Sequence, residues 1–575
     1  MADLVVYNQS QESSSEYTSS SIMEDKKWLN VIDQNNGSYQ SGQATLETTS
    51  LSTSDRLMNY REAYLAVPLV LTVANTADNN TSGLTGVNNS KVVGLKNSYT
   101  SLIHSMSVDL NGTNIIQTNP FSEFYNAFNL MTTLSWDDVK TQGSTIGFYP
   151  DDALSATSFT ADNLSGPAGA TVNNQDLVTE NENTGAVLGH IGNKGFSERL
   201  KYINFTPAGK VNGSNDEASQ SAFLTQASCN TLYKNSVFNL VAGGAGATPV
   251  VQIQVMAIIK LRQLHNFFNN IPLCRGLQFR FIINFNQSTS VIAISGGNVV
   301  TDETVAKSQF GGVVPMMIAS SKANNGGATA HTADAASSVR YDISVGNRCL
   351  DATLSAKAGV QNSSLTQSVS LYVPSYILNP SLLSTYVSSN SSKRIDYCDF
   401  YFFKINSVGA GENFNQLITS GIRGVKSVLM IPMLQSASNG GVLEYQSALS
   451  DCGGGPTALL AQVTNFQVQI GGVNQIQSNS RYEFETWNNY VYGVNAVNGG
   501  LTDGLTSGLV GQKDWGTKYL YYYVDCNRGS EAERDVPKSV QIQGQNLSAK
   551  AVDYFVYIEF HNDIVLDVGT GNIQA

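Results

Sequence analysis

The stretch IHSMSVDLNGTNIIQTNPFSEFYNAFNLM at residues 103–131 returns as VTNFQVQIGGVNQIQSNSRYEFETWNNYV at residues 463–491, displaced by 360 residues without a gap. Between positions 108 and 129, nine of 22 residues are identical in the two copies. A chain rich in Asn and Gly can produce such identity by chance. Stronger evidence for a repeat is that both copies carry the same sequence signals for a strand, a turn and a helix. The shared signals predict two related units.

Both copies predict a strand followed by a tight turn. Residues 105–110 and 466–470 alternate apolar and polar side chains, which is the period of a half-buried strand. Each strand then meets a pair of residues that tolerate positive φ at both central positions of a two-residue hairpin. The two turn pairs are Asn111 with Gly112 and Gly471 with Gly472.

A helix is predicted after each hairpin. Asn119 and Asn479 stand at the N-cap position, where a side-chain oxygen accepts a hydrogen bond from a free backbone N–H group. Glu123 and Glu483 follow near the positive end of the helix dipole. Apolar residues at spacings of three and four then indicate one buried helix face in each copy.

The composition favours a large β protein with two domains. A chain of 575 residues exceeds one ordinary core, and only 14% of its residues are charged, compared with about 25% in a typical protein. Many short strands lie between Gly-rich and Asn-rich loops, and helices are few and short. This pattern predicts an all-β chain of two tandem sandwiches or barrels with long loop insertions. Pairing of early with late strands implies Greek-key or jelly-roll wiring.

Charge and cysteine usage exclude several classes of function. The net charge of −12 argues against a broad basic surface for nucleic acid, so no sequence-specific nucleic-acid binding is expected. The six scattered cysteines form no Cys-x-x-Cys pair and are expected to be reduced thiols in a protein made inside a cell. The N-terminus lacks the pattern of a signal peptide, and the longest apolar run, at 63–74, is too short for a transmembrane segment.

Two weaker matches bracket the repeat and suggest domain boundaries. Residues 56–65 resemble residues 393–402, and residues 277–287 resemble residues 552–562 by alternation. The offset falls from 360 to 275, which would give the first unit 85 extra residues between helix and closing strand. The expected divisions are a flexible arm at 1–24, a first jelly roll at 25–290 with loops at about 150–190 and 206–248, an uncertain connection at 291–340, and a second jelly roll at 341–575.

No pattern in the sequence predicts catalysis, a cofactor or a metal. The five histidines are separated by tens of residues and lack the spacing of metal ligands. The glycine run at 241–255 lacks the Lys-Ser/Thr of a phosphate loop and leads into a strand rather than a helix. We therefore expect no catalytic, cofactor-binding or metal-binding residues, and no enzyme activity.

Three long segments carry a family resemblance: KKWLNVIDQNNGSYQSGQATLETTSLS at 26–52, LRQLHNFFNNIPLCRGLQFRFIINFN at 261–286, and FVYIEFHNDIVLDVGTGNI at 555–573. They resemble double jelly-roll major capsid proteins of eukaryotic dsDNA viruses, in particular those of Polinton-like viruses and their virophage-type relatives. The resemblance implies two eight-stranded jelly rolls and a homotrimer that forms a pseudo-hexameric capsomer. It further implies an icosahedral virion capsid assembled inside the host cell, with neighbouring capsomers and with penton and minor capsid proteins as partners.

Two alternatives from other classes remain open. A surface adhesin or carbohydrate-binding β protein would share the polar, aromatic-containing loops, but it would usually carry an export signal. A β-rich glycan hydrolase would need convergent carboxylates, whose mutation would abolish a measurable activity.

Overall fold

The structure is a computed structural model of the chain. The described residues are 23–34, 39, 41–75, 92–117, 119–151, 180–181, 186–187, 199, 237–241, 250–294, 300–307, 313–319, 338–346, 349–356, 368–389, 392–435, 443–446, 462–476, 482–491, 508–512, 514–516, 519–526, 536–567 and 573–574.

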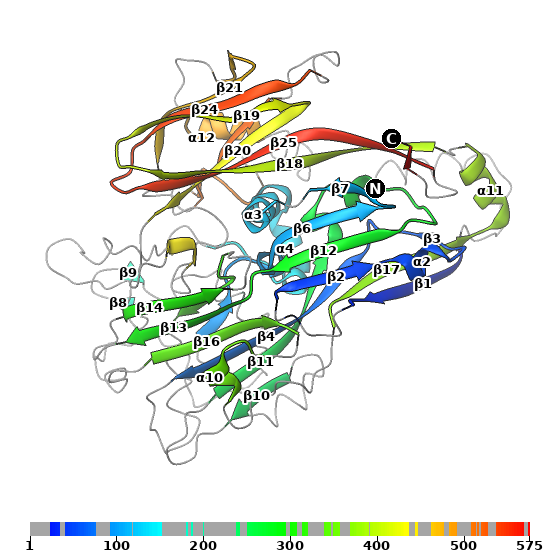
Figure 1. Ribbon diagram of the computed structural model, residues 1–575, viewed down its shortest axis with the longest axis horizontal. Helices are drawn as coiled ribbons and strands as arrows, with labels where there is room; N and C mark the ends of the chain where they lie inside the picture. The colour runs from blue at the N-terminus through cyan, green and yellow to red at the C-terminus, as the bar shows by residue number, and fades with distance from the viewer. Residues whose placement is uncertain are drawn as a thin grey trace.

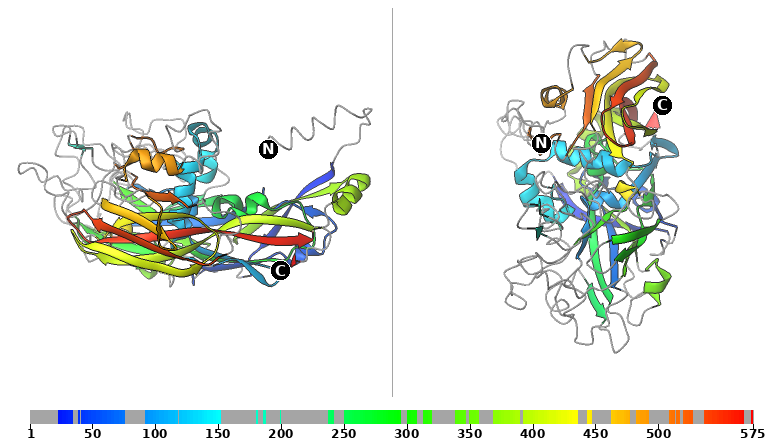
Figure 2. Two further views of the ribbon diagram at one scale, coloured as in Figure 1. Left: turned by 90° about the horizontal axis from the view of Figure 1, so that it is seen from above. Right: turned by 90° about the vertical axis from the view of Figure 1, so that its left-hand side faces the viewer.

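Two β-sandwiches lie side by side, and the strands of both run roughly along the long axis of the molecule (Figures 1 and 2). Each sandwich consists of two antiparallel sheets that enclose an apolar core. Helix α3 (Ser122–Thr133) lies between the sandwiches, and α4 (Trp136–Ile146) follows it directly. This arrangement places the repeated helix of the first unit at the boundary with the second.

The second sandwich has the strand order of a jelly roll. Its sheets are β18-β25-β20-β23 and β19-β24-β21-β22, so eight strands numbered along the chain fall in the orders 1-8-3-6 and 2-7-4-5. The short β26 (Ile573–Gln574) adds to β25. The eight strands are β18 (Ser392–Val408), β19 (Asn413–Ile422), β20 (Val425–Leu434), β21 (Val463–Ile470), β22 (Val473–Asn474), β23 (Tyr522–Asp525), β24 (Lys538–Asn546) and β25 (Val552–Asp567).

The first sandwich repeats the same order. Its sheets contain β1-β17-β4-β11 and β2-β12-β6-β7, which are again 1-8-3-6 and 2-7-4-5 along the chain. The prediction of two jelly-roll sandwiches with a few short helices is therefore confirmed. The eight strands are β1 (Met23–Ile32), β2 (Gln43–Glu47), β4 (Tyr64–Asn75), β6 (Ile103–Leu110), β7 (Thr113–Ile116), β11 (Val250–Lys260), β12 (Phe279–Phe285) and β17 (Ser370–Leu378).

The eighth strand of the first sandwich lies much later in the chain than we expected. β17 pairs with β1 and β4, although residues from 341 onward were assigned to the second jelly roll. The strand β16 (Ser338–Val345) also pairs with β4. Alternation indicates a strand but does not identify its partner, so sequence alone misplaced this region. We propose that the division between the units lies at 379–391, around α11 (Pro380–Ser389).

The segment at 291–340, expected as an uncertain connection, contributes strands to the first unit. β13 (Ser288–Ile294), β14 (Val300–Lys307) and β16 extend its large sheet, while β15 (Met316–Ala319) pairs with β5 (Val92–Leu95). β13, β14, β15 and β16 lie between the seventh and eighth strands of the jelly roll, whereas β5 lies between the third and the fourth. The corresponding connection of the second unit, between β24 and β25, spans only residues 547–551.

Both weaker sequence matches paired strands that are not equivalent. Residues 277–287 include β12, a seventh strand, whereas residues 552–562 belong to β25, an eighth strand. Residues 56–65 include β3 (Leu57–Met58) and the start of the third strand, while residues 393–402 lie in a first strand. Any half-buried strand alternates in the same way, so the alternation was no evidence of equivalence.

Two predicted regions lie mostly outside the described residues. The first is the N-terminal arm, of which only the last two residues are described, and these begin β1. The second comprises the loops at 150–190 and 206–248. The described part of the second loop includes β10 (Val237–Val241), which pairs with β11. A strand of five residues therefore lies within this expected surface loop. The described part of the first loop includes β8 (Glu180–Asn181) and β9 (Ala186–Val187).

The sheet that contains β25 is buried on both faces. Tyr554 and Val556 face the core of the second sandwich, whereas Phe555 and Tyr557 belong to a separate apolar cluster with α3 and α12 (Phe484–Val491). β18 and β25 also extend beyond the second sandwich over the first (Figure 1). There, Leu566 of β25 joins the core of the first sandwich. The long β18–β25 pair therefore contributes to three apolar clusters.

Candidate functional site at the seam between the sandwiches

The repeated hairpins have the geometry that their sequences require. The φ angles are 49° at Asn111, 85° at Gly112, 57° at Gly471 and 82° at Gly472, so both central positions are positive in each turn. The strands before the two turns, β6 and β21, have bounds that differ by 360 residues, which is the displacement of the sequence repeat. Both turns are exposed. The return strand β7 of the first hairpin reaches the boundary between the sandwiches, where the Tyr397 hydroxyl donates to the Ile115 carbonyl oxygen at 2.9 Å.

Asn119 does not cap helix α3, so that prediction is wrong. The helix begins at Ser122 and is preceded by Phe121, which has a φ of 58° and makes no side-chain capping bond. The positive φ of Phe121 redirects the chain before the first helical residue, and this moves the helix start past the position that the sequence indicated. Glu123 does lie in the first turn. Asn479, the equivalent of Asn119, lies outside the described residues.

Asn119 instead joins the first unit to the free edge of β18. Its Nδ2 donates to the Phe400 carbonyl oxygen at 2.6 Å, and its Oδ1 accepts from the Phe402 N–H at 3.3 Å. The asparagine is 7% exposed, so these bonds are shielded from water. The side-chain amide thus bonds one backbone carbonyl group and one backbone N–H group of β18, which a neighbouring strand would otherwise have bonded.

Two more asparagines of the first unit continue this contact along β18. The Cys398 N–H donates to Asn266 Oδ1 at 3.1 Å, and Asn270 Nδ2 donates to the Asp396 carbonyl oxygen at 2.7 Å. The bonded backbone groups thus belong to alternate residues of β18, 396 to 402, which face the same edge of the strand. We call this contact the seam: Asn119, Asn266 and Asn270 against residues 396–402. It satisfies an edge that would otherwise be open to pairing with another chain.

Aromatic rings pack against the outer face of the second sandwich beside the seam. Tyr125 of α3 stacks on Phe400 with ring centroids 4.5 Å apart, and Phe121 lies 4.9 Å from Phe555. The Tyr557 hydroxyl donates to the Phe121 carbonyl oxygen at 2.7 Å. Such aromatic pairs contribute about 0.5 to 1.5 kcal/mol each beyond the burial of their surface. The packing therefore fixes the position of α3 relative to the second sandwich.

Buried ionisable groups at the seam are held by specific partners. His265 Nε2 lies 3.3 Å from Asp399 Oδ1, which also accepts from the Phe400 N–H at 2.8 Å. Glu559 accepts from Lys426 at 3.1 Å and from the Ser427 hydroxyl at 2.8 Å. Burial opposes the charge on Lys426, but Glu559 and Cys398 together outweigh that effect and raise the pKa of the lysine.

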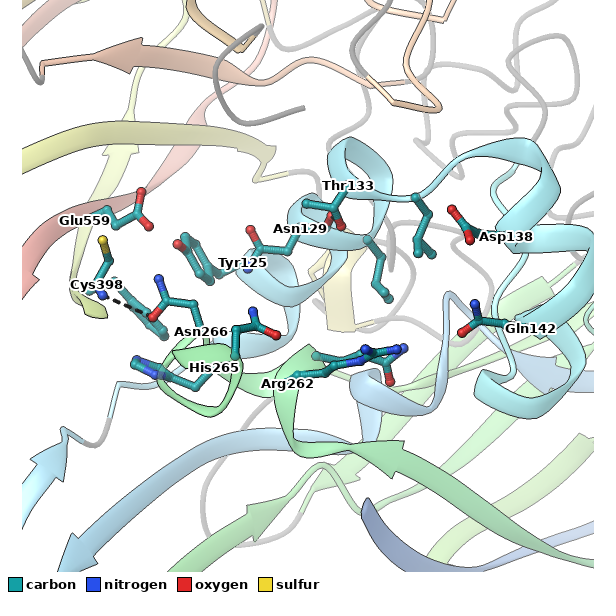
Figure 3. Close-up of a pocket in the computed structure, with 15 residues that line it drawn as sticks. Tyr125, Asn129, Thr133, Asp138, Gln142, Arg262, His265, Asn266, Cys398 and Glu559 are labelled. Atoms are coloured by element: carbon teal, nitrogen blue, oxygen red, sulfur yellow. Dashed lines mark hydrogen bonds between the residues drawn. The ribbon is translucent and has the colours of Figure 1, made fainter. Parts of the chain in front are cut away.

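A cavity of about 410 Å³ lies next to these groups (Figure 3). Residues of α3 and α4 line one side, residues of α8 (Leu261–Leu264) and α9 (Phe267–Asn270) line another, and Cys398, Phe400 and Glu559 close it from the second sandwich. Asn129 and Thr133 face Arg262 across the cavity (Figure 3). Both units therefore contribute to its wall.

The described part of the chain contains no group of three or more His, Cys, Asp or Glu side chains placed to hold a metal ion. The four cysteines in that part are buried free thiols. Within the same residues, no helix has the length and apolar character needed to cross a membrane.

Comparison with known proteins gave structural matches alone. No protein-family model and no curated protein sequence matches the chain. The chain is similar to the Faustovirus major capsid protein, with 12% identity, a TM-score of 0.41, and coverage of 96% of this chain and 91% of that one. It is similar to the chain in a quasi-atomic model of the PBCV-1 virus capsid, with 9% identity, a TM-score of 0.41 and 98% coverage of both chains. The STIV major capsid protein matches with 7% identity and a TM-score of 0.30, over 93% of this chain and 96% of that one.

Proposed function

We propose that the chain is the major structural protein of an icosahedral virus shell, located in the virion capsid, with no catalytic role. The observation that carries the proposal is the presence of two jelly rolls with the same strand order, held side by side in one chain. Jelly rolls are a recurrent architecture of viral capsid domains. Three copies of a two-sandwich chain would present six similar walls, so a homotrimer would form a pseudo-hexagonal capsomer that can tile a lattice.

The seam supports this proposal because a capsomer needs a fixed angle between its two sandwiches. Three asparagines bond the edge of β18, and the α3 aromatic rings pack against the same sheet. A flexible linker alone would leave the two sandwiches free to move relative to each other. In our proposal the bonded seam makes each chain a rigid third of the hexagon.

The differences between the two units would give the capsomer its distinct surfaces. In the first unit, residues 117–249 separate the fifth and sixth strands, and residues 286–369 separate the seventh and eighth. The equivalent connections in the second unit span residues 475–521 and 547–551. We propose that the longer connections carry contacts with neighbouring capsomers and with penton and minor capsid proteins.

Lattice formation tests the proposal directly. The purified chain would be concentrated and examined by negative-stain electron microscopy for hexagonal sheets or closed shells. We expect ordered hexagonal arrays whose repeating unit is a trimer. The same sample would be screened for glycan binding and glycan hydrolysis. Strong glycan binding or hydrolysis by a protein that never forms arrays would support the adhesin or hydrolase alternative and contradict the coat function.

A further inference from the structure

The cavity beside the seam has the size and lining of a small-molecule site. Its volume of about 410 Å³ lies within the usual range for ligand pockets, roughly 300 to 1,000 Å³. Five side-chain amides contribute to the polar lining, and Tyr125 and Phe400 add aromatic surface. Amide groups both donate and accept hydrogen bonds, so such a wall suits a ligand that carries hydroxyl groups.

Arg262 supplies a positive charge that the described part of the chain does not neutralise. No hydrogen bond or ion pair joins its guanidinium group to another described residue, although it lines the cavity. A second cation lies nearby, because Lys260 Nζ donates to the cavity residue Gln142 at 3.1 Å. Burial and then the charge of Arg262 lower the pKa of Lys260. An anion in the cavity would relieve this repulsion.

The carboxylates in the wall of the cavity already have other partners. One Asp138 oxygen accepts from the backbone N–H and the hydroxyl of Ser135 at the start of α4. Glu559 accepts from Lys426 and Ser427 on the side of the second sandwich. Neither is paired with Arg262. The guanidinium fork is therefore available for a carboxylate from outside the chain, which it can bind through two parallel hydrogen bonds.

We propose that the cavity binds a small hydroxylated carboxylate of the sugar-acid class. Its carboxylate would bind Arg262, and its hydroxyl groups would bond the amides of Asn129 and Asn269, which have no side-chain partner among the described residues. The carbon face of the ligand would contact Tyr125. Because both units line the cavity, the ligand would strengthen the contact between them. This site is independent of coat assembly, so either proposal can fail alone.

Calorimetric titration of the full chain with D-glucuronate tests the proposal, and D-glucose is the matched neutral control. We expect saturable glucuronate binding and at least about tenfold weaker binding of glucose, because a charge-assisted hydrogen bond is lost. Arg262→Gln should weaken glucuronate binding by a similar factor. Arg280→Gln, on an exposed arginine outside the cavity, should leave it unchanged.

A second variant keeps the test independent of how Arg262→Gln folds. Asn269 is exposed at the cavity, so Asn269→Trp should fill the opening and abolish glucuronate binding without disturbing the core. Equal binding of glucose and glucuronate, glucuronate binding that survives both substitutions, or no binding at millimolar glucuronate would each overturn the proposal. Particle mass, measured on the same samples, reports separately on assembly.

Discussion

Asn119 stabilises the seam because one amide group bonds two backbone groups of β18 that would otherwise be buried without partners. Leaving a buried polar group unsatisfied costs about 1 to 3 kcal/mol, which is more than the net gain from forming an ordinary hydrogen bond. At the scale of residues, the seam therefore depends on a few amide side chains whose removal leaves backbone groups unpaired.

The first prediction concerns Asn119 itself. Asn119→Ala should lower the free energy of unfolding by about 2 to 4 kcal/mol, since the Phe400 carbonyl and the Phe402 N–H both lose a partner. Asn114→Ala is the control, because the side chain of the exposed Asn114 bonds only the half-buried Asp109 side chain. Urea unfolding measures both variants. Equal stability of the two would show that Asn119 does not hold the seam.

The hairpin glycines give a second prediction, which rests on backbone conformation alone. A Cβ atom at Gly112 would meet no atom within 4 Å, but the φ of 85° is strained for a residue with a side chain. Gly112→Val should therefore lower the free energy of unfolding by about 1 to 2 kcal/mol. Gly112→Asn should cost clearly less, since Asn tolerates this region. If Val and Asn prove equally tolerated in thermal unfolding, our account of the turn is wrong.

Asp342 gives the third prediction, on pH. Burial raises the pKa of this carboxyl group to about 7 from its ordinary 3.8, even though the backbone N–H groups of Leu350 and Asp351 donate to it. The folded chain therefore holds this proton to higher pH than the unfolded chain. The protonated Asp342 therefore stabilises the fold at acid pH. As pH rises from about 4 to about 7, the free energy of unfolding falls by at most roughly 4 kcal/mol.

Asp342→Asn should remove this component of the pH dependence, because an amide does not ionise and its oxygen can still accept the two N–H groups. Chemical denaturation across the same pH range, on the original chain and the variant, measures the difference. Parallel stability profiles for the two proteins would contradict the assignment.

Elements of the two units meet where the segment at 508–512 contacts the end of α3. The Leu509 N–H donates to the Met131 carbonyl oxygen at 2.8 Å. A Cβ atom at Gly508 would lie 2.5 Å from that oxygen and 2.6 Å from the carbonyl oxygen of Thr132. Glycine is therefore required at residue 508 for the second unit to approach the helix of the first unit this closely.

The fourth prediction compares two glycines with similar backbone angles. Gly508 and Gly516 have φ values of 65° and 77°, but a Cβ atom at Gly516 would meet nothing within 4 Å. Gly516→Ala should lower the free energy of unfolding by about 1 to 2 kcal/mol, through conformation alone. Gly508→Ala should lower it by about 2 kcal/mol more, because backbone atoms have to shift. Equal losses in urea unfolding would argue against this contact.

Local patterns in the sequence identified elements but not their partners. The 360-residue repeat predicted β6 and β21 and their turns, because alternation and turn chemistry are properties of adjacent residues. It did not reveal that β17 closes the first sandwich, because strand partners are chosen by packing between distant segments. The seam asparagines were missed for the same reason. Asn119 was noticed for a capping role, while Asn266 and Asn270 lie in an ordinary Asn-rich stretch.

At the scale of the whole molecule, the seam joins two similar sandwiches. The strand order is the same in both, whereas the connections between the fifth and sixth strands and between the seventh and eighth strands are much longer in the first. Similarity would allow six near-equivalent walls in a trimer, and the longer connections would distinguish the two kinds of wall. The rigidity of the seam determines whether the six walls keep a hexagonal outline.

The central claim is that three of these rigid chains form one pseudo-hexagonal particle. Light scattering on the purified protein, combined with class averages from electron microscopy, measures its mass and outline together. We predict a mass three times that of the single chain and a six-sided outline built of paired lobes. A particle that stays monomeric at all concentrations and shows two lobes without a hexagonal outline would contradict the account.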